Sequence, residues 1–196
     1  ALLSEKGLAP LDPAVARRTA GRGGKALIAL GHERAGAPLD GPAVDALFPH
    51  YLALYEARID QESRLFPGVE PALQRLATAG WRLGVCTNKP EAPAQVLMER
   101  LGVRPLFASL IGADTLPQRK PDPAPYIAAV ERAGGAVGQS VLIGDTVTDR
   151  DTPRPVGVPG ILVTFGPNGD GVAKLAPDAL LHGYGDLLDV VKDVIG

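Results

Sequence analysis

The sequence predicts an α/β protein in which a doubly wound parallel sheet follows a helical segment. Two observations carry this prediction. Apolar residues recur at steps of three and four along residues 1–66, and short apolar strands alternate with helical segments along residues 67–196. Hydrophobic residues make up 45% of the chain, which suffices for a core around such a sheet. We therefore expect a helical domain over 1–66 and an α/β domain over 67–196.

Residues 1–66 carry the signals of consecutive helices. Asp12 is a candidate N-cap, and Pro13 stands at the first helical position, where proline is tolerated. The apolar stripe is clearest over residues 40–59, at Val44, Leu47, Phe48, Tyr51, Leu52 and Tyr55. This spacing predicts an amphipathic helix that buries one face.

From residue 67 onward the pattern predicts helix 67–80, strand 81–87, helix 91–102, strand 107–113, helix 122–134, strands 140–144, 160–166 and 178–181, and helix 184–195. Gly80 and Gly102 end the first two helices, because glycine adopts the left-handed conformation found at helix ends. Strands joined by helices of this length run parallel in a sheet that is covered on both faces.

Charge and cysteine usage exclude several classes of partner. The net charge is −2, from 20 basic and 22 acidic residues, so nothing favours a nucleic-acid or membrane-surface partner. No apolar run is long enough to span a bilayer. Cys86 is the only cysteine, which fits a reducing compartment and predicts a cytoplasmic protein. The chain is compatible with a monomer or a homodimer.

Polar residues follow the predicted strand 81–87. Thr87 and Asn88 come at its end, and Lys89 precedes the next helix. Ligands of parallel sheets bind at the carboxyl ends of the strands, and a hydroxyl, an amide and the N–H groups of a helix N-terminus can bind an anion there. Taken alone, the pair is better explained by helix capping through Thr87 or Asn88.

A second loop presents Lys120 between prolines. Pro117, Pro121 and Pro123 stiffen this segment and lower the entropy cost of holding one side chain in place. A lysine held this way could neutralise a phosphate. The alternative is an ordinary solvated lysine.

A third loop, VLIGDTVTDRD, is rich in aspartate. Asp145 directly follows a buried strand, and Asp149 comes four residues later. Two carboxylates aimed at one point suit Mg²⁺, which takes one or two protein carboxylates and keeps several waters. Helix capping is the alternative for Asp149 and Asp151. Together the three loops suit phosphoryl transfer, which needs cations and donors around a phosphate and a metal to offset charge.

The segments GVCTNKP, QRKPDP and VLIGDTVTDRD resemble the second, third and fourth motifs of the haloacid dehalogenase-like hydrolases, and in particular their phosphoglycolate phosphatase branch. The resemblance implies a Rossmann-like core and a Mg²⁺-dependent phosphomonoesterase. It assigns phosphate binding to Thr87, Asn88 and Lys120, with Thr87 and Lys120 acting in catalysis, and the metal to Asp145 and Asp149.

The same resemblance makes residues 1–66 a cap that selects a small phosphorylated metabolite. Arg22, flanked by glycines in AGRGG, is the candidate contact to the substrate, because arginine can pair a carboxylate through two hydrogen bonds. An exposed arginine at a helix end explains the residue equally well. A phosphosugar mutase of the same fold and a catalytically inactive phosphate-binding module are the alternative functions.

In this family an aspartate nucleophile comes from an Asp-x-Asp motif at the end of the first core strand, and the 196 residues contain no such motif followed by Gly-Thr. We expect that strand to lie upstream of Ala1 in a longer protein; the other explanation is a form that cannot perform the chemistry. Without the strand, the sheet should have a gap between the strands that end at Thr87 and Asp145. Pro153 and Pro155 further predict a short or irregular helix after the aspartate loop.

Overall fold

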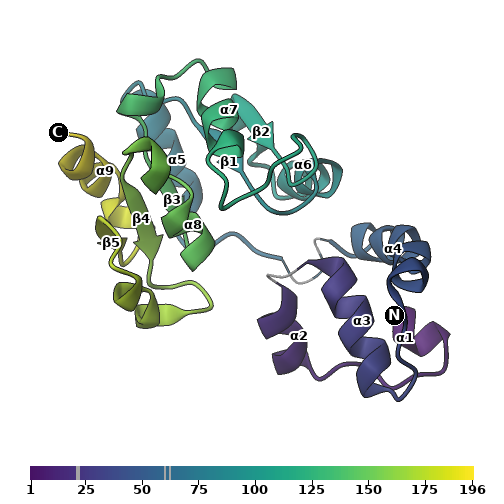
Figure 1. The fold of residues 1–196 in the computed structure, drawn as a ribbon. Helices are drawn as coiled ribbons and strands as arrows, with labels where there is room; N and C mark the ends of the chain where they lie inside the picture. Colours follow the sequence, from purple (N-terminus) through teal and green to yellow (C-terminus); the bar gives the residue numbers. More distant parts are fainter. Residues whose placement is uncertain (21–22, 60, 62) are drawn as a thin grey trace. The chain divides into compact units, whose positions relative to one another are not determined.

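The computed structural model describes residues 1–20, 23–59, 61 and 63–196, and they form two compact units, Ala1–Ser63 and Arg64–Gly196. The first unit is helical, with α1 (Leu2–Glu5), α2 (Pro13–Ala20), α3 (Gly24–Arg34) and α4 (Gly41–Glu56) (Figure 1). Asp12 accepts hydrogen bonds from the Ala14 and Val15 N–H groups at 2.9 and 3.1 Å, as the sequence predicts for the start of α2.

The core of the helical unit is small and apolar. Leu2, Ile28 and Val44 are buried, one from each of α1, α3 and α4. The predicted stripe of α4 packs around them through partly buried residues, including Leu47, Phe48, Tyr51 and Leu54. No helix of the described residues is long and apolar enough to cross a membrane.

The second unit is the α/β domain. Its strands are β1 (Gly84–Cys86), β2 (Ser109–Ile111), β3 (Leu142–Gly144), β4 (Gly160–Val163) and β5 (Ala179–Leu181). Its α-helices are α5 (Val69–Thr78), α6 (Glu91–Arg100), α7 (Ala124–Arg132), α8 (Val147–Asp151) and α9 (Leu187–Ile195). Short 3-10 turns are η1 (Arg104–Leu106), η2 (Val137–Gln139), η3 (Arg154–Val156), η4 (Gly169–Leu175) and η5 (Tyr184–Asp186). The order of helices and strands matches the sequence prediction.

Every strand pairing among the described residues is parallel, but the strands form two sheets. β1 pairs with β2, with Gly84 opposite Ser109, and a separate sheet has the order β3-β4-β5. β1 and β3 are therefore each paired on one side only by the part of the chain that the structure describes. This division is the gap expected from the sequence, and it explains why the predicted strand 81–87 is regular over only three residues.

Helices cover both faces of the larger sheet. Ile143 packs into the core formed with α5 and α9, whereas its neighbour Leu142 packs with Tyr126 of α7. Adjacent strand residues point to opposite faces, so α7 lies on the face opposite α5 and α9. Cys86 of β1 packs against the same cluster, and α7 packs on β1 and β2, so this cluster links the two sheets.

The helix after the aspartate loop is short, as Pro153 and Pro155 predict. α8 has five residues, and η3 follows it at Arg154. Pro153 is fully buried rather than exposed in a loop. The short α8 nevertheless carries Asp149 toward the site described below.

Candidate active site

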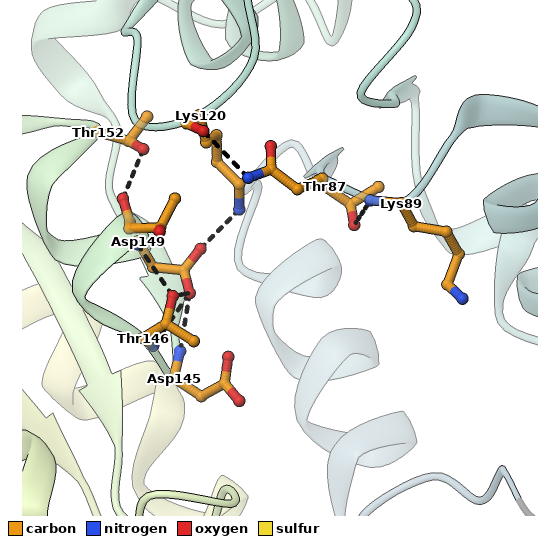
Figure 2. A network of polar contacts seen from close by, with 9 residues as sticks. Thr87, Lys89, Lys120, Asp145, Thr146, Asp149 and Thr152 are labelled. Carbon is orange, nitrogen blue, oxygen red and sulfur yellow. Dashed lines mark hydrogen bonds and ion pairs between the residues drawn. The ribbon is translucent and has the colours of Figure 1, made fainter. Parts of the chain in front are cut away.

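Lys120 and Asp149 form a buried ion pair at the carboxyl ends of the strands. The Lys120 Nζ lies 2.6 Å from the Asp149 Oδ1, and the two side chains are only 8% and 10% exposed (Figure 2). Lys120 is therefore not a solvated surface lysine. A pair this well buried needs close geometry and further hydrogen bonds to offset the loss of hydration.

Asp149 obtains those hydrogen bonds from the start of α8. Its Oδ2 accepts from the Thr146 hydroxyl at 2.7 Å and from the N–H groups of Asp145 and Thr146 at 3.2 and 3.1 Å. Thr146 and Asp149 form a reciprocal capping box. Burial alone would raise the pKa of Asp149, but the charge and hydrogen bond of Lys120 lower it below its usual range. Asp149 thus caps the helix, which is one of its two alternatives from the sequence, and it also pairs with Lys120.

Gly144 makes room for this arrangement. A Cβ atom on Gly144 would lie 2.3 Å from both the Cβ and the Cγ of Asp149, closer than real atoms approach. The end of β3 therefore requires glycine, because α8 crosses directly over the strand.

Asp145 is the carboxylate left for a cation. It is half-buried, and in Figure 2 its carboxylate points away from the Lys120–Asp149 pair. Burial and then the negative charge of Asp149 raise the pKa of Asp145. The Asn168 side chain donates to the Asp145 backbone carbonyl at 3.0 Å and fixes the loop.

A divalent cation fits this donor set. It would offset both causes that raise the pKa of Asp145, namely burial and a neighbouring negative charge. No group of three or more His, Cys, Asp or Glu side chains that could hold a metal gathers among the described residues, at this site or at another. One protein carboxylate, Asp145, with other positions left to water agrees with the habits of Mg²⁺.

Thr87 and Asn88 directly follow β1, and of these two described residues only Asn88 has a hydrogen bond to the loop of Lys120. The Asn88 amide donates to the Lys120 carbonyl at 3.0 Å, and the Thr87 hydroxyl accepts from the Lys89 N–H at 3.1 Å. Neither caps α6, whose N-cap residue is Pro90. Hydrogen bonds therefore join the Thr87–Asn88 loop to Lys120, and the ion pair joins Lys120 to Asp149, so loops from both sheets meet (Figure 2).

The structure does not add the remaining two candidates, Asp151 and Arg22, to this cluster. Asp151 pairs with its neighbour Arg150 at 2.5 Å and is exposed by 41%. Arg22 falls outside the described residues.

Sequence reasoning missed three residues that shape the site: Gly144, Thr146 and Asn168. The spacing of Thr146 and Asp149 is that of a capping box and could have identified Thr146. Asn168 has no such local signal, because it reaches Asp145 from a loop that is distant in the sequence.

The sequence of residues 12–157, which is most of the chain, matches the family model of the haloacid dehalogenase-like hydrolases. The chain belongs to this family. A phosphoglycolate phosphatase from Caulobacter vibrioides is 42% identical over 194 residues, covering 99% of this chain and 81% of that protein. One from Rhodospirillum rubrum is 38% identical over 191 residues, covering 95% and 79%. The hydrolase described here is accordingly a phosphatase.

Solved structures share the fold of this hydrolase at low identity. A predicted phosphoglycolate phosphatase of Haemophilus somnus 129PT has a TM-score of 0.85 at 24% identity, covering 96% of this chain and 86% of that one. A β-phosphoglucomutase of Clostridium difficile has a TM-score of 0.76 at 14% identity, covering 99% and 86%. At these identities the likeness concerns the fold alone.

Proposed function

We propose that the protein is a Mg²⁺-dependent phosphomonoesterase that acts on 2-phosphoglycolate or a similar small phosphorylated acid. The observation that carries the proposal is the buried Lys120–Asp149 pair, which joins the loop after β2 to the loop after β3. The hydrogen bond from Asn88 to the Lys120 carbonyl adds the loop after β1. The names of the sequence relatives support the choice of substrate. The single cysteine supports a cytoplasmic setting, and a monomer or a homodimer would serve equally.

Each residue has a distinct task in this proposal. Lys120 neutralises the phosphoryl oxygens, and the hydroxyl of Thr87 donates a hydrogen bond to them, with help from the backbone at Asn88. Asp145 would hold Mg²⁺ directly, with Asp149 supporting it while restraining Lys120. Bound Mg²⁺ supplies charge neutralisation for the phosphate and its leaving oxygen. We assign Arg22 to the substrate carboxylate on sequence grounds.

The nucleophile belongs, in this proposal, to a strand between β1 and β3. Both of these strands keep one edge unpaired by the described residues, and an extended segment there would pair with each. Its last residue would stand at the rim shared by Thr87 and Asp145. An aspartate at that position would attack phosphorus while the P–O bond to the substrate breaks, so that the leaving oxygen departs as an alcohol and an aspartyl-phosphate forms. Water would then cleave the aspartyl-phosphate to the free aspartate and inorganic phosphate.

The test measures release of inorganic phosphate from 2-phosphoglycolate by the protein that carries this strand, with Mg²⁺ and with EDTA. We expect turnover that requires Mg²⁺ and falls by about 100-fold or more in Lys120→Met, as for the loss of a donor that stabilises developing charge. Lys192→Met, on the exposed end of α9, is the matched control and should retain activity.

Other products would identify the alternative functions. Isomerised sugar phosphate without release of phosphate would indicate a phosphosugar mutase. Phosphate binding without any turnover would indicate an inactive binding module. Either result would reject the phosphomonoesterase.

A further inference from the structure

Three aromatic residues from distant parts of the α/β unit pack against one another beside the aspartate loop. Phe66 lies just before α5, Phe165 just after β4, and Tyr184 at the start of η5. The rings of Phe66 and Phe165 meet edge to face with centroids 5.2 Å apart, and those of Phe165 and Tyr184 are 5.0 Å apart. We call these three residues the aromatic wall.

The loop that carries Phe165 lies directly against Asp145. A Cβ atom on Gly166 would lie 3.0 Å from the Asp145 Cβ and 3.4 Å from its Oδ2, so no side chain separates the loop from the carboxylate. Two residues further on, Asn168 donates to the Asp145 carbonyl at 3.0 Å. The position of this loop therefore limits the conformations open to Asp145.

The far end of the aromatic wall is anchored. The Arg75 guanidinium of α5 donates to the carbonyls of Tyr184 and Gly185 at 3.2 and 3.1 Å. Gly68, at the start of α5, comes close enough that an added Cβ would contact the Tyr184 Cβ at 3.7 Å. The backbone at Tyr184 is thus anchored, while Phe66 at the other end of the aromatic wall is 46% exposed.

The Tyr184 side chain also lies within electrostatic reach of Asp145. Its pKa is raised by burial and, in addition, by the negative charge of Asp145. This agrees with the ring contacts, which bring Tyr184 to Phe165 and hence to the loop packed on Asp145.

We propose that Phe66, Phe165 and Tyr184 are positioning residues, which hold the loop after β4 against Asp145 and thereby set the orientation of its carboxylate. This inference rests on the proposed role of Asp145 as a Mg²⁺ ligand. In this proposal the aromatic wall acts on Asp145 through the loop at Gly166. Groups that orient metal ligands in this way typically change metal affinity by 10- to 100-fold when removed.

The test is Mg²⁺ binding by the intact enzyme, measured by isothermal titration calorimetry. Phe66 is the informative site, because an exposed residue can be truncated without opening the core. We expect Phe66→Ala to weaken Mg²⁺ binding by about tenfold with an unchanged melting temperature. Phe66→Tyr, which keeps the ring, should restore the parental dissociation constant. Phe48→Leu, in the core of the helical unit, should leave that constant unchanged.

Two results would reject the inference and are distinguishable. If Phe66→Ala and Phe165→Leu both bind Mg²⁺ within twofold of the parent, while Asp145→Asn does not bind it, then the aromatic wall does not position Asp145 and the proposed metal site stands. If the parent enzyme itself binds no Mg²⁺, the metal site and the inference fail together.

Discussion

The buried Lys120–Asp149 pair allows a quantitative test of how the site is held together. At 2.6 Å and an effective dielectric constant of about 20, two unit charges attract by about 6 kcal/mol before the cost of desolvation. Removing one partner of a buried pair leaves the other charge uncompensated and typically costs about 3–5 kcal/mol. Asp149 retains three other hydrogen bonds, so we expect Lys120→Met to lie near about 3 kcal/mol.

Urea unfolding measures this loss. Trp81 is the only tryptophan and packs against the core of the α/β unit, so its fluorescence follows that unit alone. The double variant Lys120→Met/Asp149→Asn removes both charges and keeps a side-chain acceptor for the donors at the start of α8. It should be more stable than Lys120→Met, since no unpaired charge remains.

A solvated ion pair provides the control. Lys25 and Asp45 are 2.7 Å apart, but their side chains are 54% and 62% exposed. Lys25→Met, followed by circular dichroism because it lies in the helical unit, should cost less than about 1 kcal/mol. If Lys120→Met also cost less than about 1 kcal/mol, or if the double variant were the least stable, the ion pair would not hold the loops together.

Three further predictions follow from the same loop. Gly144→Ala forces a Cβ into Asp149 and should cost about 1–3 kcal/mol in urea unfolding, whereas Gly138→Ala, with no atom within 4 Å, should change little; equal losses would contradict the crowding. The pKa of Asp149 is lowered in the folded state, so the ionised carboxylate stabilises the fold fully well above about pH 4, and this stabilisation is lost as pH falls through the folded pKa. The urea midpoint of unfolding should therefore drop in acid, and it should drop by less in Asp149→Asn. Asp145 has a raised pKa, so its ionised form is disfavoured by folding at neutral pH; Asp145→Asn should raise the urea midpoint without Mg²⁺ while abolishing Mg²⁺ binding, and a lowered midpoint would contradict this sign.

Local patterns were enough to predict the elements of the α/β unit. Gly80 and Gly102 end α5 and α6 with φ angles of 91° and 76°, because the left-handed conformation that they predicted is set by the residue itself. Pro153 and Pro155 similarly predicted the short α8, since proline limits a helix wherever it stands.

The site was predictable only where a residue's type and place restrict its role. Asp145 and Lys120 could be singled out because a carboxylate and a lysine beside buried strands need partners. The arrangement of these residues relative to one another could not be predicted. The charge of Lys120 is neutralised by Asp149 and not by a bound phosphate, and this contact depends on how two loops 29 residues apart in the sequence meet. The aromatic wall could not be predicted for the same reason, because Phe66, Phe165 and Tyr184 are far apart in the sequence and belong to no periodic pattern.

The separation of the strands into two sheets has a consequence for tuning the enzyme. Thr87 follows a strand of one sheet and Asp145 a strand of the other, so the distance between the two residues is not fixed by a continuous backbone ladder among the described strands. In the proposed enzyme, the strand between β1 and β3 would act as a spacer for that distance. Bulkier or smaller side chains on the spacer would then alter reactivity without altering any residue that contacts the phosphate.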